Sequence, residues 1–105
     1  MSDTVSAVPP EKCISMTEVR AGVDAVDQAL VALLVKRFGY MDAAARIKDQ
    51  RAAVRDEARK QEVLNNVKAA ALASGLPEEP IVKLWDLLVE SSIAYELEQW
   101  NANRN

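Results

Sequence analysis

A single arginine, Arg37, interrupts an apolar stripe that predicts the buried face of a long helix. The stripe recurs at spacings of three and four residues, as one side of a helix does, and it consists of Val19, Val23, Val26, Leu30, Leu33, Arg37, Tyr40, Ala44 and Ile47. A buried guanidinium is costly unless it meets an anion. Lys48 follows about three turns later and about 20° further round the helix, so these two cations predict a pocket that holds an anion.

Polar residues also occupy the apolar faces of two later helical segments. Asp56 and Arg59 share one line with the apolar residues of the second segment, and Ser92 and Glu96 stand four residues apart on the third. Taken singly, Asp56 and Arg59 are best explained as a salt bridge at a helix start. Arg37 and Glu96 offer a second internal pair. Taken together, the cations outnumber the acids in a small core, which is costly without a bound anion.

A further arginine, Arg20, lies about 25 Å before Arg37 along the helix axis and about 100° round it. Arg20 therefore cannot reach the same small ligand within one chain, but it can enter the partner's site in an antiparallel dimer. The alternative, an ordinary surface arginine, is favoured by spacing alone. Arg37 and Lys48 lie about 16 Å apart along the helix, which suits a compact organic dianion. The chain has no glycine-rich phosphate loop, which argues against nucleotides.

These side chains require long helices to position them, and the sequence predicts an all-α fold. We expect a disordered tail at residues 1–12 and one helical domain at residues 13–105. The expected helices run from about Ser15 to about Gln50, from Arg55 or Asp56 to Ala73, and from between Pro77 and Pro80 to about Trp100. Ser15 and Glu18 resemble a capping box, and Gly75 is typical of a helix stop.

The length of the first helix predicts the assembly. A helix of about 35 residues is about 50 Å long, whereas a compact monomer of this size has a radius of gyration of about 13 Å. One chain cannot cover both ends of such a helix, but a second chain packed antiparallel along it can. We therefore expect an obligate, intertwined homodimer.

Composition excludes several functional classes. The net charge of −3 over 105 residues argues against a nucleic-acid partner. No apolar run is long enough for a membrane span, and the first residues do not resemble a secretory signal. One cysteine, Cys13, suits a reducing cytoplasm, where we expect the protein. With no histidine and a single cysteine, we expect neither a metal site nor a Ser-His or Cys-His nucleophile.

Residues 16–101 resemble the all-helical chorismate mutases, the type II family. The resemblance rests on V-R-A-G-V-D-A-V-D-Q-A-L-V-A-L-L-V-K-R, then A-A-A-R-I-K, V-R-D-E-A-R and E-S-S-I-A-Y-E. The chain is also similar to the isochorismate-pyruvate lyases, through P-E-K-C, G-Y-M-D-A-A-A-R-I-K and Trp100. The first resemblance implies the cofactor-independent rearrangement of chorismate to prephenate, in aromatic amino acid biosynthesis. The second implies cleavage of isochorismate to salicylate and pyruvate.

The resemblance also implies roles for individual residues. Arg20 of the partner chain, Arg37 and Arg59 would hold the two carboxylates of the substrate, since bidentate pairing suits arginine. Ser92 would help at the ring carboxylate.

Three further residues would act at the remaining oxygens of the substrate. Lys48 would donate a hydrogen bond to the ether oxygen whose bond breaks, and Glu96 would contact that oxygen from the other side. Asp56 would accept a hydrogen bond from the ring hydroxyl.

Two positions depart from the family pattern. Many members have glutamine at position 96, and an ionised Glu96 cannot donate a hydrogen bond. The resemblance therefore implies a protonated carboxyl, and with it either activity that rises toward acid pH or a pKa that burial raises. Lys60 stands where some members have a glutamate that contacts the ring hydroxyl. Chorismate mutase is the first hypothesis and the lyase the second. A helical dimerisation module without catalysis is the third, in which these charges form only structural pairs.

Overall fold

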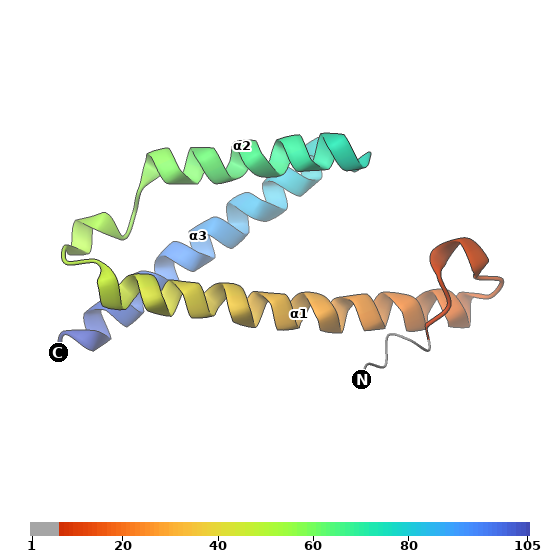
Figure 1. Cartoon of the computed structure of the whole chain (residues 1–105), viewed down its shortest axis with the longest axis horizontal. Helices are drawn as coiled ribbons and strands as arrows, with labels where there is room; N and C mark the ends of the chain where they lie inside the picture. The colour runs from red at the N-terminus through yellow and green to blue at the C-terminus, as the bar shows by residue number, and fades with distance from the viewer. Residues whose placement is uncertain (1–6) are drawn as a thin grey trace. The chain divides into compact units, whose positions relative to one another are not determined.

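The computed structural model describes residues 7–105, which form helices and no strand. The elements are η2 (Pro10–Lys12), α1 (Met16–Ile47), η3 (Arg51–Ala53), α2 (Glu57–Ser74) and α3 (Glu78–Asn103), shown in Figure 1. The all-α class with three α-helices and a long first helix is therefore confirmed. No helix within this part of the chain is long and apolar enough to cross a membrane. Of the expected tail, residues 1–6 lie outside the described residues, and Pro10–Lys12 form a 3₁₀ turn.

The chain divides into two compact units, one up to Phe38 and one from Gly39 to Asn105. In the first unit, α1 begins as its sequence predicts. The Ser15 hydroxyl accepts a hydrogen bond from the Glu18 backbone N–H at 3.2 Å, and the Glu18 carboxylate accepts one from the Ile14 backbone N–H at 2.8 Å. The glutamate thus reaches one residue further back than in a regular capping box, and two N–H groups at the helix start are satisfied.

The apolar stripe of α1 is exposed in the single chain. Val26 is 58% exposed, Leu30 is 50% exposed and Leu33 is 62% exposed. Together with the segment around Pro9 and Cys13, these side chains line a groove of about 720 Å³. The chain therefore presents an apolar surface on α1 that its own described residues leave open to solvent.

In the second unit, α2 packs against α3 to form a helical hairpin. Ala71 of α2 and Val89 of α3 are buried, as are Val54 after η3 and Ala45 near the end of α1. Gly75 ends α2 at a φ of 75°, where a side chain would be strained. The Leu76 N–H bonds to the Ala71 carbonyl across this glycine, which is the expected helix stop.

An ionic cluster ties the start of α2 to α3. Arg55 pairs with both carboxylate oxygens of Glu90, at 2.6 and 3.1 Å. Lys60 lies 2.6 Å from Glu90 and 2.9 Å from Asp86. Hydrogen bonds from Arg55 and then Lys60 lower the pKa of Glu90 to about 2, and those from Glu90 and Asp86 raise the pKa of Lys60. The cluster therefore holds Lys60 against α3.

Glu90→Gln should lower the melting temperature at neutral pH, by a few degrees at most for a partly exposed pair. Because the folded-state pKa of Glu90 lies below its ordinary value of 4.5, its contribution is present above about pH 4.5 and is lost as the pH falls toward 2. Thermal unfolding followed by circular dichroism should show the gap between the variant and the parent closing at low pH. Glu98→Gln is the matched control. A difference in melting temperature between Glu90→Gln and the parent that is as large at low pH as at neutral pH contradicts the prediction.

Candidate functional site

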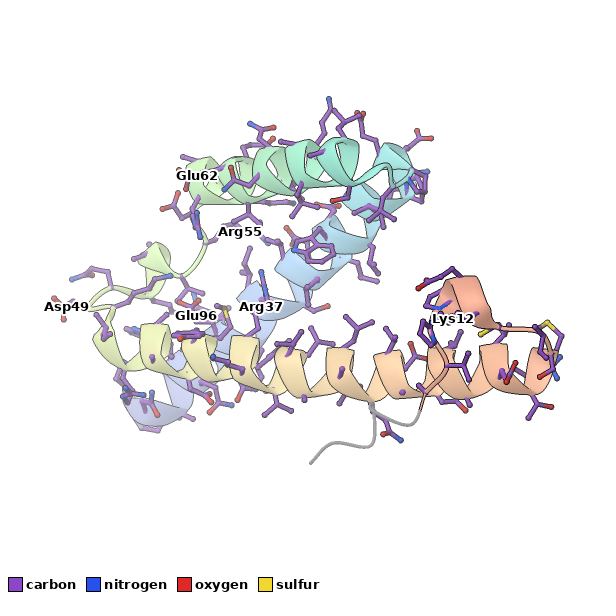
Figure 2. The ribbon with its side chains drawn as sticks, turned by 45° about the vertical axis from the view of Figure 1, so that its right-hand side comes forward. Lys12, Arg37, Asp49, Arg55, Glu62 and Glu96 are labelled. Atoms are coloured by element: carbon purple, nitrogen blue, oxygen red, sulfur yellow. The ribbon has the colours of Figure 1, made fainter. Side chains whose placement is uncertain are left out.

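The structure brings together two of the predicted site residues, Lys48 and Glu96. Lys48 directly follows the last residue of α1, and its Nζ lies 2.7 Å from Oε2 of Glu96 on α3. Glu96 is only 4% exposed, whereas the Lys48 side chain is 29% exposed. Glu96 belongs to the C-terminal half of α3 and is labelled in Figure 2. A buried carboxylate and a partly accessible ammonium therefore meet at one point of the second unit.

The contact between Lys48 and Glu96 is electrostatic more than directional. Glu96 Oε2 is buried and accepts no hydrogen bond of regular geometry, although the ammonium is close enough for an ion pair. Lys48 Nζ also lies 3.5 Å from the Val54 carbonyl oxygen, to which it donates. An ammonium so placed keeps hydrogen-bonding capacity for another acceptor, because it carries three donor hydrogens.

Ser92 lies one turn before Glu96 on α3, and it is 3% exposed. Its hydroxyl donates to the Leu88 carbonyl at 2.7 Å, the bond by which a mid-helix serine commonly satisfies its donor. Ser92 and Glu96 are the buried polar residues of the part of the chain that the structure describes. Buried polar groups on one helix face are uncommon in so small a core, which supports a functional role for this face.

Asp56 and Arg59 have structural roles at the start of α2. The Asp56 carboxylate accepts a hydrogen bond from the Arg59 backbone N–H at 3.0 Å and so forms the N-cap of the helix. The Arg59 guanidinium instead pairs with Glu62 at 2.6 Å. The salt bridge offered for Asp56 and Arg59 from sequence is therefore wrong, because the acid bonds to the backbone of Arg59 and not to its side chain. Both side chains are exposed.

The two remaining predicted residues lie on α1 in the first unit. Arg20 is exposed, and Arg37 is half-buried and engaged in interactions of its own. The two hollows described within the units contain none of the predicted site residues. One is the apolar groove on α1, and the other is a space of about 380 Å³ beside Arg51, Arg55 and Glu90. The described chain also holds no group of three or more metal-type side chains.

Sequence reasoning missed the side chains that hold the backbone of Lys48. Trp100 Nε1 donates to the Lys48 carbonyl at 2.9 Å, and Arg104 donates to the same oxygen at 2.6 Å. Arg104 lies at the C-cap of α3, beyond the periodic pattern, so no sequence signal marks it. From sequence, Trp100 is only the expected end of the third helix and one of the residues shared with the lyases. Its four-residue distance from Glu96 could have placed it on the same helix row.

Comparison with known proteins adds two findings. The family described as chorismate mutase type II matches residues 19–97 of the chain. A curated relative from Pseudomonas aeruginosa, named isochorismate pyruvate lyase, is 27% identical over 95 residues, which cover 90% of this chain and 94% of the relative. The family match spans every residue predicted for the site.

Proposed function

The chain belongs to the chorismate mutase type II family, and we propose that it converts chorismate to prephenate without a cofactor. The observation that carries this proposal is the contact between the partly accessible Lys48 ammonium and the buried Glu96 carboxyl. The rearrangement breaks a carbon–oxygen bond while a carbon–carbon bond forms, and negative charge builds on the departing ether oxygen. A fixed ammonium at that oxygen stabilises the transition state more than the ground state.

The second part of the mechanism is selection of the reactive conformer. The substrate is a dicarboxylate, and Arg37, Arg59 and the partner's Arg20 hold its two carboxylates so that the reacting carbons approach each other. The conformational entropy that the free substrate must lose to reach the transition state is then lost on binding, before the chemical step. Ser92 assists at the ring carboxylate and Asp56 accepts from the ring hydroxyl. Asp56 would do so while it also caps α2, since a carboxylate accepts several hydrogen bonds.

Glu96 must be protonated when the substrate binds. In the chain without substrate its carboxyl faces Lys48 at 2.7 Å. When the substrate binds, the Lys48 ammonium donates a hydrogen bond to the ether oxygen. An ionised Glu96 beside that oxygen would repel the negative charge that develops on it. A protonated Glu96 instead donates to the same oxygen. A protonated Glu96 thus takes the role that the amide N–H of glutamine would have in family members with glutamine at this position.

The active form is an intertwined homodimer. The support is the apolar face of α1, on which Val26, Leu30 and Leu33 are each at least 50% exposed. A contiguous apolar surface of this kind marks an interaction site, and the 32-residue helix offers it over many turns. A second copy packed antiparallel covers the face and delivers its Arg20 to the site.

The relative named isochorismate pyruvate lyase favours a second candidate, since it matches nearly the whole chain. The same cations would bind the carboxylates of isochorismate equally well. Purified protein supplied with each substrate separately decides between the two: prephenate from chorismate supports the mutase, whereas salicylate and pyruvate from isochorismate support the lyase. If neither chorismate nor isochorismate is turned over, the proposal is overturned, and the non-catalytic dimerisation module is the remaining hypothesis.

Lys48→Ala should lower kcat by about 100-fold to 1,000-fold, the usual cost of removing one donor to a developing oxyanion. Steady-state assays with chorismate measure the effect. Lys83→Ala removes an exposed lysine of α3 and is the matched control, with kcat expected at the parental value. Near-parental turnover in the Lys48 variant would contradict the role of Lys48 as the donor to the ether oxygen.

Glu96→Gln should raise activity at neutral pH and remove its dependence on acid. The amide donates at every pH, whereas the carboxyl donates only when it is protonated. The parent protein should therefore gain kcat as the pH is lowered, and the variant should show a flat profile. Profiles of kcat from about pH 5 to 8 test this. A flat profile in the parent that coincides with that of the variant would contradict the role of the proton.

Mixed dimers test whether Arg20 acts across the interface. Arg20→Ala and Lys48→Ala should each be nearly inactive alone. When the two variants are unfolded together and refolded, half of the dimers should be mixed, and each mixed dimer has one intact site, so about a quarter of parental activity should return. No recovery, or a monomer in sedimentation analysis, argues against a shared site.

A further inference from the structure

We propose that Trp100 and Arg104 are positioning residues that hold Lys48 in place for catalysis. This inference rests on the proposed function for its catalytic meaning. The hydrogen bonds that they make to Lys48 do not involve its ammonium. Both contact the other end of the residue, its backbone carbonyl oxygen, where Trp100 donates at 2.9 Å and Arg104 at 2.6 Å.

The end of α1 needs such donors. A helix leaves its last carbonyl groups without partners, and α1 has no glycine after Ile47 to turn the chain back and satisfy them. Arg104 supplies the donors from α3 instead, because it also donates to the Ala45 carbonyl at 2.9 Å. Its positive charge suits the negative end of the α1 dipole. The residue therefore caps α1 from another helix.

The two donors hold each other in place. The Arg104 guanidinium lies 4.2 Å from the centre of the Trp100 ring, within the range of an attractive cation–π contact. The indole N–H and the guanidinium thus approach the Lys48 carbonyl as one unit. Loss of either group should weaken the hold of the other.

One row of α3 fixes both ends of Lys48. Glu96, Trp100 and Arg104 follow one another at intervals of four residues, so they lie along neighbouring turns with about 40° between steps. Glu96 faces the ammonium at 2.7 Å, and the other two hold the carbonyl. The distance between the ammonium and the carboxyl is therefore set by a single helix, and an error of about 1 Å in such a contact can cost about 100-fold in rate.

Trp100→Phe and Arg104→Leu test the inference in the full chain. Each should lower kcat by about tenfold while KM stays within about twofold, because the carboxylate contacts remain. Arg104→Lys should restore part of the rate, since a lysine can reach one carbonyl. Asn101→Ala is the matched control, because the Asn101 side chain accepts a hydrogen bond from Arg51 at 3.3 Å, whereas the Lys48 carbonyl is held by Trp100 and Arg104. Parental kinetics are expected.

A second readout does not depend on activity. Trace acetylation followed by peptide mass spectrometry measures how fast the Lys48 amine reacts, with Lys83 as the internal reference. Trp100→Phe and Arg104→Leu should speed acetylation of Lys48 several-fold without changing that of Lys83, and Asn101→Ala should leave both unchanged. Parental reactivity of Lys48 in both variants overturns the inference, as does an equal gain in Asn101→Ala.

The two readouts separate the inference from the proposed function. Faster acetylation together with lower kcat supports positioning, whereas faster acetylation with parental kcat overturns a role in catalysis. If the parent protein turns over neither chorismate nor isochorismate, the proposed function fails, and the acetylation rates still decide whether Trp100 and Arg104 hold Lys48.

Discussion

The ion pair between Lys48 and the buried Glu96 is the contact on which the arrangement of the second unit depends. A buried charge is tolerated only beside a counter-charge, so the last turn of α1 and the C-terminal half of α3 must stay in register. The 4% exposure of Glu96 makes this requirement strict. Under the proposed function the same constraint serves catalysis, because a fixed ammonium would exchange its carboxyl partner for a substrate oxygen without a change of fold.

Several surrounding contacts also keep the end of α1 and the start of α2 in register with α3. Trp100 and Arg104 hold the backbone at the end of α1, and Arg55 clamps the start of α2 to Glu90 on α3. The segment between these anchors carries Val54, whose side chain is buried and whose carbonyl accepts from Lys48. The short connection between α1 and α2 is therefore held at both ends by residues of α3 or its C-cap, which makes α3 the element that organises the unit.

Membership of the chorismate mutase type II family accounts for the apolar and charged residues of α1 together. Under the proposed function, the exposed stripe would meet a second copy of the chain and Arg37 within it would meet the substrate. The departures from the pattern lie elsewhere. Lys60 is committed to Asp86 and Glu90, so its charge is balanced within the hairpin. Under the proposed function, Glu96 would be where the chemistry of this chain differs from that of members with glutamine.

The sequence alone determined the three α-helices and most of their ends, because local signals mark them, although no glycine or proline marks the end of α1 at Ile47. Helical periodicity defined the three helices, Ser15 and Glu18 marked the start of α1, and Gly75 marked the end of α2, each within a few residues. It also selected the polar residues that face inward on α3. Only the tertiary structure decided the partners of the polar side chains: Glu96 with Lys48, Asp56 with a backbone N–H, and Arg104 with the carbonyls of Ala45 and Lys48. Spacing along one helix gives the face of a residue but not which residue of another helix meets it, since that depends on how the helices pack.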